Sequence, residues 1–209
     1  ITSDATADKQ QIPVLNFEQR AGSYNPNKLV SLETPLLNMN CPSLSKAFFS
    51  CEKLTTIPGN LFEKNTKATD FSGCFYYCRA LQTIPGGLFA SNTAATDFNS
   101  CFFNCDLLEE IPSELFANNT EAGNFTYCFA QCKRLTAIPE NLFEKNKAAT
   151  DFRNCFQLCS ALKAIPGGLF ANNTAATSFS YCFYGCTGLR TIPEGLFAKN
   201  AEAINFNSC

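Results

Sequence analysis

Apolar residues recur along this chain at a fixed interval. An Ile-Pro pair occurs six times, always 27 residues apart, with the isoleucines at Ile57, Ile84, Ile111, Ile138, Ile165 and Ile192. Around each pair, Phe, Leu and Cys return at the same offsets without an insertion. A fixed period of this size is typical of a solenoid, in which each unit buries its apolar face only against its neighbours. The pattern therefore predicts one elongated repeat body.

The order of polar and apolar positions also predicts the elements of each unit. One column holds only preferred helix N-cap residues: Ser43, Asp70, Asp97, Asn124, Asp151, Ser178 and Asn205. Apolar residues follow this cap at i, i+3, i+4 and i+7, which predicts a short helix over 71–78 and its equivalents. A short strand is expected at 81–84, ended by Pro85, which cannot donate to a ladder. A brief helical turn is expected at 88–89.

One column is asparagine in every unit: Asn65, Asn92, Asn119, Asn146, Asn173 and Asn200. Asn could end the second helical turn with a positive φ, which it tolerates better than other non-glycine residues. Alternatively, a buried ladder of Asn amides could satisfy backbone groups of the neighbouring turn. Both interpretations are structural, so no ligand is expected at this column.

The N-terminal part of the chain departs from the repeat. We assign residues 1–37 to a polar N-terminal segment and cap, and residues 38–209 to the repeat solenoid. Residues 1–10 are expected to be loose, and the apolar island 12–17 to cap the open end as a strand or plug, because one side of a terminal repeat faces water. Any export or lipid signal is expected to lie before Ile1.

Composition argues against several function classes. The chain has no His and no Trp, a net charge of -2, and 16% charged residues. The commonest general base and metal ligand is therefore missing, and no phosphate loop or nucleophile elbow is present. We expect no enzyme activity, no cofactor and no metal. Without a basic stripe, nucleic acid is not an expected partner, and the apolar runs are far shorter than the roughly 20 residues that cross a bilayer.

The repeated pattern Phe-x-x-Cys-Phe-x-x-Cys-x-x-Leu-x-x-Ile-Pro, with Ala-Phe-Phe-Ser-Cys-Glu-Lys-Leu at 47–54, resembles the BspA-type leucine-rich repeats of bacterial surface proteins. The resemblance covers about residues 38–209, although this unit is longer and carries Cys where Ala or Met is common. It implies an α/β, leucine-rich-repeat-like solenoid, a right-handed coil of about six repeats, each a short strand plus a short helix. It also implies a secreted or surface-anchored bacterial protein with a role in adhesion or host binding.

Twelve of the thirteen cysteines form two columns of six, and Cys41 belongs to neither. The first column is Cys74, Cys101, Cys128, Cys155, Cys182 and Cys209, and the second is Cys51, Cys78, Cys105, Cys132, Cys159 and Cys186. Disulfides could join the two columns or form within one, since counting does not fix the connectivity. Unpaired thiols packed as small hydrophobes are the favoured alternative, because Ala47 fills the first column without a disulfide. Zinc is not expected, for lack of His and of C-x-x-C spacing.

The two positions inside each Leu-x-x-Ile segment are expected to point outward and to form a candidate binding face. Its charge runs from acidic in the middle to basic near the C-terminus, and its principal members are Gln82, Glu109, Glu110, Lys163 and Arg190. Glu109 and Glu110 are adjacent, so on a strand they would point to opposite sides and form a poor acid-base pair.

A partly exposed aromatic set is the second candidate surface, with Tyr76 and Tyr184 as its binding residues beside Phe49 and Phe103. Exposed aromatic residues are common binding anchors, although in a repeat they also cover the core beneath. The sequence thus predicts a module that binds a protein or a carbohydrate along an extended face. The alternative is a structural spacer within a larger surface protein.

Overall fold

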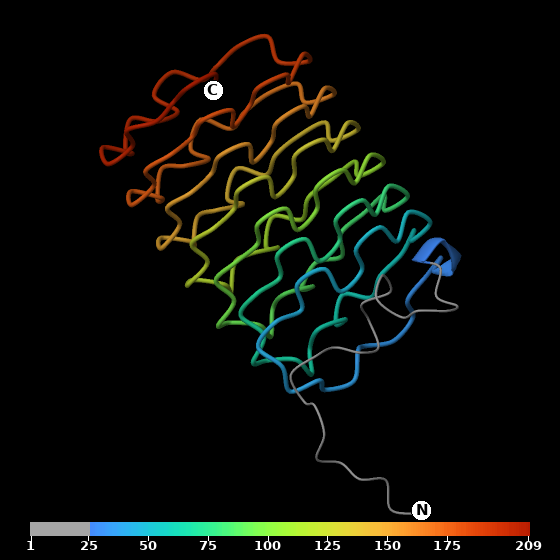
Figure 1. Cartoon of the computed structure of the whole chain (residues 1–209). Coiled ribbons are helices and arrows are strands. Elements are labelled where there is room, and N and C mark those ends of the chain that lie inside the picture. Colours follow the sequence, from blue (N-terminus) through green and yellow to red (C-terminus); the bar gives the residue numbers. More distant parts are fainter. Residues whose placement is uncertain (1–25) are drawn as a thin grey trace, which may run out of the picture.

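The computed structural model describes residues 26–209, whose chain winds as a stack of similar coils (Figure 1). Within this range the only helix is the three-residue 3-10 helix η1, Pro26–Lys28. Strand pairing in the same range consists of isolated parallel bridges. The prediction of stacked 27-residue units is confirmed, whereas the hand of the coil and the number of repeats stay predictions. The expected loose segment 1–10 and plug 12–17 lie outside the described residues.

The column of cap residues forms the longest bridge ladder in the described chain. Each member pairs with the next one in parallel: Ser43, Asp70, Asp97, Asn124, Asp151, Ser178 and Asn205. The side chains still act as caps, because the Ser72 N–H donates to Asp70 Oδ1 at 2.9 Å. An acceptor two residues before the donor closes a turn of the Asx type. These residues therefore cap turns and pair coils, and do not begin helices.

The predicted short helix over 71–78 is wrong. The Phe71 N–H donates at 2.9 Å to the Asp97 carbonyl of the next coil, and the Cys74 N–H closes a turn onto the Phe71 carbonyl at 3.1 Å. Gly73, the third residue of this turn, has a φ of 60°, as a type II turn requires and an α-helix does not allow. The adjacent coil thus supplies the carbonyls that an α-helix would supply internally.

The strand expected at 81–84 and the helical turn expected at 88–89 are also absent from the described chain. Across the Leu-x-x-Ile segments, pairing is reduced to isolated bridges such as Thr83 with Glu110. Residues 86–91 form turns, with the Ala90 N–H donating to the Gly87 carbonyl at 3.0 Å. The proline after each isoleucine lacks an N–H, which limits the ladder at this point.

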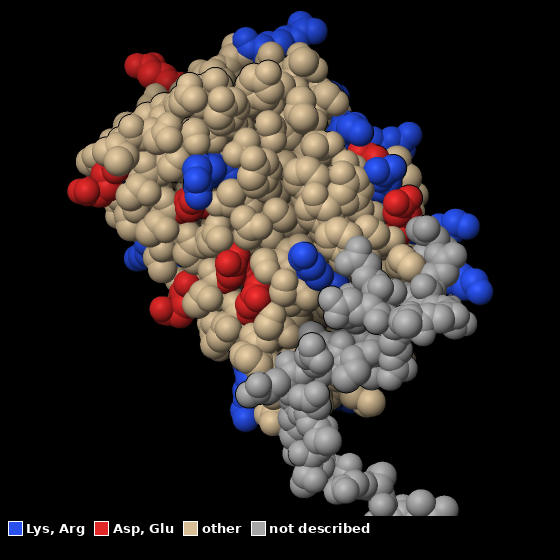
Figure 2. Space-filling model, in the orientation of Figure 1, with Lys and Arg blue, Asp and Glu red and all other residues tan. Residues whose placement is uncertain are grey.

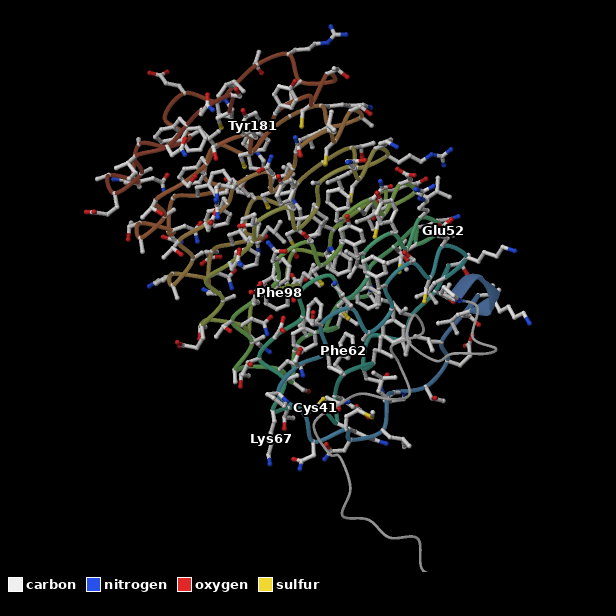
Figure 3. All side chains as sticks on the ribbon, viewed as in Figure 1. Cys41, Glu52, Phe62, Lys67, Phe98 and Tyr181 are labelled. Atoms are coloured by element: carbon white, nitrogen blue, oxygen red, sulfur yellow. The ribbon has the colours of Figure 1, made fainter. Side chains whose placement is uncertain are left out.

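Phenylalanine rings fill the centre of the stack. Equivalent rings of successive coils stack face to face, as Phe75 and Phe102 do with centroids 5.4 Å apart and planes 5° apart. Figure 3 shows Phe62 and Phe98 inside the coil. The expected burial of the Phe columns is confirmed except near the C-terminus, where Phe197 is half-buried and Phe206 is exposed. The three files are Phe48, Phe75, Phe102, Phe129, Phe156 and Phe183; Phe71, Phe98, Phe125, Phe152, Phe179 and Phe206; and Phe62, Phe89, Phe116, Phe143, Phe170 and Phe197.

The asparagine column forms a buried ladder. Asn119 Nδ2 donates to the Asn92 carbonyl at 2.8 Å and to the Phe89 carbonyl at 3.1 Å. The same two bonds recur at Asn92, Asn146, Asn173 and Asn200. None of the column's residues has a positive φ. The ladder interpretation is confirmed and the helix-end interpretation is wrong.

All thirteen cysteines are free thiols in the structure, and twelve of them are buried. In the second column the thiols donate across coils, as Cys105 Sγ does to the Phe75 carbonyl at 3.4 Å and Cys132 Sγ does to the Phe102 carbonyl at 3.3 Å. A disulfide would remove these donors. The second column therefore acts as a hydrogen-bonding ladder as well as an apolar filler.

Thiol labelling gives a direct test of this arrangement. We expect intact-mass spectrometry to find thirteen adducts when the protein is unfolded in an alkylating reagent without prior reduction. In the folded protein we expect the buried thiols to be protected and the half-buried Cys209 to react first, because alkylation needs an accessible thiolate. A single adduct after unfolding would show that the columns are disulfide-bonded.

The segment before the first cysteine lies along the first full coil. The Thr55 N–H donates to the Val30 carbonyl at 2.8 Å, and the Leu36 N–H donates to the Leu61 carbonyl at 2.9 Å. Leu32 is partly buried against the core. This part of the chain therefore covers one end of the described apolar files, while the boundary at residue 37 stays a prediction.

Candidate functional site

The two residues inside each Leu-x-x-Ile segment form a surface that we refer to as the Leu-x-x-Ile face. Its predicted members are all exposed, as expected: Gln82, Glu109, Glu110, Lys163 and Arg190. Backbone hydrogen bonds hold consecutive coils in register along it, since the Glu109 N–H donates to the Gln82 carbonyl at 3.1 Å and the Lys163 N–H to the Thr136 carbonyl at 3.2 Å. Four successive coils, from that of Gln82 to that of Lys163, are thus held in one row, and Arg190 belongs to the fifth.

Glu109 and Glu110 lie at the centre of this face. They line two shallow depressions of about 400 and 250 Å³, together with Thr136 of the next coil. Arg134, which the sequence did not single out, reaches Glu109 with Nη1 3.5 Å from Oε1. Glu110 has no ion-pair partner within residues 26–209. The centre of the face therefore keeps an unneutralised carboxylate, and Arg190 lies farther along the stack.

The aromatic set is only partly brought together. Phe49, Tyr76 and Phe103 stack face to face, with centroids 4.8 and 4.7 Å apart and planes within 7°. Burial and the neighbouring Tyr77 raise the pKa of Tyr76. Tyr184 occupies the same column but does not join the stack.

The stack is interrupted because two non-aromatic residues, Ala130 and Gln157, stand between Phe103 and Tyr184 in this column. Tyr184 instead contacts Tyr181, with centroids 5.5 Å apart. The two predicted aromatic binding residues, Tyr76 and Tyr184, therefore belong to separate surface groups.

Tyr77 is a further aromatic residue at this surface, and it was not selected from the sequence. Its ring meets Tyr76 edge to face with centroids 4.7 Å apart, and the Arg79 guanidinium lies 4.9 Å from its centroid. Other coils carry residues such as Asn104 and Leu158 in the same column. No recurring aromatic pattern could therefore indicate this position.

Charged side chains in Figure 2 lie mainly toward the edges of the visible face, and its middle carries few of them. Among the ion pairs, Lys133 Nζ lies 2.9 Å from Asp106 Oδ1 in the previous coil. The Asp151 carboxylate, 2.6 Å from Arg153 Nη2, raises the pKa of that guanidinium. Within residues 26–209 no group of three or more metal-ligating side chains is found, and no helix there is long and apolar enough to span a membrane.

Comparisons with solved structures show distant likenesses. No family model and no curated protein matches the chain. The structure is similar to Toll in the Drosophila Toll–Spatzle complex, at 17% identity and a TM-score of 0.31, covering 87% of this chain and 33% of that chain. It is similar to TLR13 in its complex with ssRNA13, at 12% identity and a TM-score of 0.30, covering 80% and 38%.

A leucine-rich cell surface protein from Faecalibacterium prausnitzii A2-165 is a further similar structure, at 16% identity and a TM-score of 0.19, covering 78% of this chain and 75% of that chain. The chain spans little more than a third of the Toll and TLR13 chains. Because these TM-scores are low, the resemblance to BspA-type leucine-rich repeats continues to rest on the repeated residues.

Proposed function

We propose that this chain is a recognition module that binds a protein through the Leu-x-x-Ile face. The supporting observation is the way the coils differ from one another. In the column of Arg79, three residues before that face, every coil has a different residue: Glu52, Arg79, Asp106, Lys133, Ser160 and Thr187. The face itself presents Thr55, Gln82, Glu109, Thr136, Lys163 and Arg190 in its first column.

Variation differs among the surface columns: it is also high in the column of Tyr77, and it is low in one exposed column. The column that follows the Leu-Phe pair contains only Glu or Ala: Glu63, Ala90, Ala117, Glu144, Ala171 and Ala198. A spacer needs only polar side chains on all its faces, and gives no reason for one face to differ from another. A recognition surface uses a different side chain in each coil to match its ligand. The uneven variation therefore favours recognition over a spacer.

Recognition without catalysis, and a secreted or cell-surface location in a bacterium, are part of this proposal. They follow from the resemblance to BspA-type repeats and from the lack of histidine. The acidic pair Glu109 and Glu110 in one middle coil and Lys163 two coils further on suit a protein ligand with the opposite order of charges.

A binding screen against extracellular matrix proteins and a glycan array tests the proposal. For a protein ligand that binds, we expect the double variants Glu109→Gln/Glu110→Gln and Lys163→Gln/Arg190→Gln to weaken binding about tenfold, with reduced salt dependence, because complementary charges are lost. The matched control is Glu63→Gln/Glu144→Gln, which makes the same charge change in the column of low variation.

Equal effects of the control and the face variants would place the binding surface elsewhere. Binding to glycans alone would replace a protein ligand with a carbohydrate. A screen in which neither class binds would favour the spacer.

A further inference from the structure

Five aromatic side chains form a continuous surface cluster across four adjacent coils, and we refer to them as the aromatic patch: Phe49, Tyr76, Tyr77, Phe103 and Tyr127. Each ring contacts another member, through the Phe49–Tyr76–Phe103 stack, the edge of Tyr77 and the Phe103–Tyr127 contact at 6.0 Å. All five side chains are half-buried, so each retains exposed surface. The patch is therefore a concentrated apolar surface with tyrosine hydroxyl groups.

The fold does not require aromatic rings at these positions. Ala130 and Gln157 occupy the column of Tyr76 in later coils, and Ala130 is fully buried there. Asn104 occupies the column of Tyr77 in the next coil. A small or polar residue thus completes the same coil elsewhere, and covering the core does not account for the patch.

Two of the tyrosines also have an unfavourable backbone conformation. Tyr77 has a φ of 62° and Tyr127 a φ of 56°. Equivalent positions carry Asn104 and Gly185 for Tyr77, and Gly73 and Asn154 for Tyr127, residue types that adopt the left-handed region more easily. The left-handed conformation therefore belongs to the repeated turn, which accommodates these two tyrosines at the surface.

Two cations lie over rings of the patch. Lys46 Nζ is 5.6 Å from the Phe49 centroid, and Arg79 Cζ is 4.9 Å from the Tyr77 centroid. Neither makes an ion pair with a carboxylate within residues 26–209. Two such cations give the patch a local positive charge that is available to a partner.

The carboxylates of the adjacent cap ladder are already engaged. Asp70 accepts hydrogen bonds from Ser43 Oγ at 2.8 Å and from the Ser72 N–H at 2.9 Å. Asp97 accepts from the Asn99 N–H at 2.7 Å. These carboxylates are hydrogen-bonded within the cap ladder, whereas the charged groups that lie over the rings of the patch are the cations Lys46 and Arg79.

The stacking geometry favours a protein segment over a sugar at this surface. Phe49 and Phe103 cover the two faces of the Tyr76 ring, so that ring offers only its edge and hydroxyl to a ligand. A shallow depression of about 370 Å³ lies beside it, walled by Phe49 and Tyr76 and by the polar residues Ser72 and Asn99. Apolar side chains fit between such edges, and rigid aromatic residues are frequent anchors of protein interfaces.

We propose that the aromatic patch docks an acidic protein segment, whose apolar side chains contact the rings while carboxylates at either side pair with Lys46 and Arg79. This surface differs from the Leu-x-x-Ile face, so the inference adds a second interaction site to the proposed function. Its partner chemistry is set by the unpaired cations and by the exposed ring edges.

Selection from a display library of random peptides of about 12 residues, long enough to span the patch when extended, tests the proposal. We expect enrichment of peptides in which Asp or Glu flanks Leu or Phe. The selected peptides should bind the Tyr77→Asn/Tyr127→Asn variant about tenfold more weakly, as expected for loss of anchor residues. Lys46→Ser/Arg79→Ser should remove the preference for carboxylates and the salt dependence of binding.

The repeat itself supplies substitutions that the coil accommodates. Asn104 and Asn154 already occupy the columns of Tyr77 and Tyr127, and Ser100 and Ser160 those of Lys46 and Arg79. Thermal unfolding close to that of the parent protein will show that these variants fold. The control variant is Tyr184→Gln. Tyr184 is an aromatic residue in the column of Phe49, Tyr76 and Phe103 but lies outside the patch, so this change should leave peptide binding unchanged.

Enrichment of basic or uncharged peptides, or selected peptides whose binding survives both patch variants, would overturn the inference. Glycan-array binding that is lost in the patch variants while no peptide is enriched would also overturn it, in favour of a sugar. Loss of peptide binding in Glu109→Gln/Glu110→Gln alone would assign the peptides to the Leu-x-x-Ile face, leaving the proposed function intact.

Discussion

Raising the pH to about 10 is expected to unfold this protein, because its buried thiols remain protonated in the folded state. Burial raises the pKa of Cys51 to about 12, from an ordinary value of 9.0. Burial also raises the pKa of nine other repeat thiols: Cys74, Cys78, Cys101, Cys105, Cys128, Cys132, Cys155, Cys159 and Cys182. Cys186 is the exception, because a hydrogen bond with Cys159 lowers its pKa.

The direction of the effect follows from proton binding. Above about pH 9 the thiols of the unfolded chain lose protons while those of the folded chain keep them, so the free energy of unfolding is unaffected below this pH and falls as the pH rises toward the folded pKa values. Each thiol removes about 1.4 kcal/mol per pH unit in this range. Ten thiols would remove roughly 14 kcal/mol by about pH 10, comparable with the roughly 5–15 kcal/mol that stabilises a typical domain.

Denaturant unfolding followed by circular dichroism at pH 8, 9 and 10, in the presence of a reductant, measures this dependence. The triple variant Cys74→Ala/Cys101→Ala/Cys128→Ala, which copies the alanine at position 47, should have a slope smaller by about 1.4 kcal/mol per pH unit for each thiol removed. Because the slope is compared, any cavity introduced by alanine does not affect the conclusion. A free energy of unfolding that stays level between pH 8 and 10 would contradict the prediction.

Phe116→Ala is expected to destabilise the fold by about 3–5 kcal/mol, the range for removing a buried phenylalanine. Phe116 is fully buried and lies at the centre of the described files. Its ring stacks on Phe89 and Phe143, each at 6.1 Å, and meets Phe98 at 4.7 Å and Phe125 at 5.0 Å. The substitution would interrupt one file and leave a cavity against another.

The matched control is Phe103→Ala, at a half-buried ring whose column contains Ala130 in the following coil. We expect this change to cost about 1 kcal/mol or less, because the coil already accommodates alanine there and most surface changes have small effects. Chemical denaturation of both variants measures the difference. Equal losses would show that the internal files do not dominate the stability.

The buried columns could be predicted from the sequence because they depend on which residue type recurs. The helices could not be predicted correctly from the same pattern. A spacing of i, i+3, i+4 and i+7 places Phe71, Cys74 and Phe75 on one side of a helix and on one side of consecutive tight turns alike. Hydrogen bonds to the next coil, such as the one from the Phe71 N–H to the Asp97 carbonyl, stabilise the turns in place of a helix. These bonds link residues far apart in sequence, which a local pattern does not reveal.

At the candidate surfaces, too, some features could be predicted from the sequence and others could not. The outward direction of Gln82 and Lys163 could be predicted because each stands between two buried anchors. The pairing of Arg134 with Glu109 and the place of Tyr77 could not, since they depend on how adjacent coils are offset. Positive φ at Tyr77 was also unexpected, because tertiary packing overrides the usual preference for glycine or asparagine.

Backbone amides donate in both directions along the stack, since the Glu109 N–H donates to the preceding Gln82 carbonyl, while the ladder side chains donate to the preceding coil. The Phe71 amide donates to the following coil, whereas Asn92 Nδ2 and Cys78 Sγ donate to carbonyls of the preceding one. A coil emerging from the ribosome can therefore donate hydrogen bonds to carbonyls of the preceding, already folded coil. Its own carbonyls then accept hydrogen bonds from the unpaired amides of that preceding coil. Folding can keep pace with translation one coil at a time, with the newest coil always the most open to hydrogen exchange.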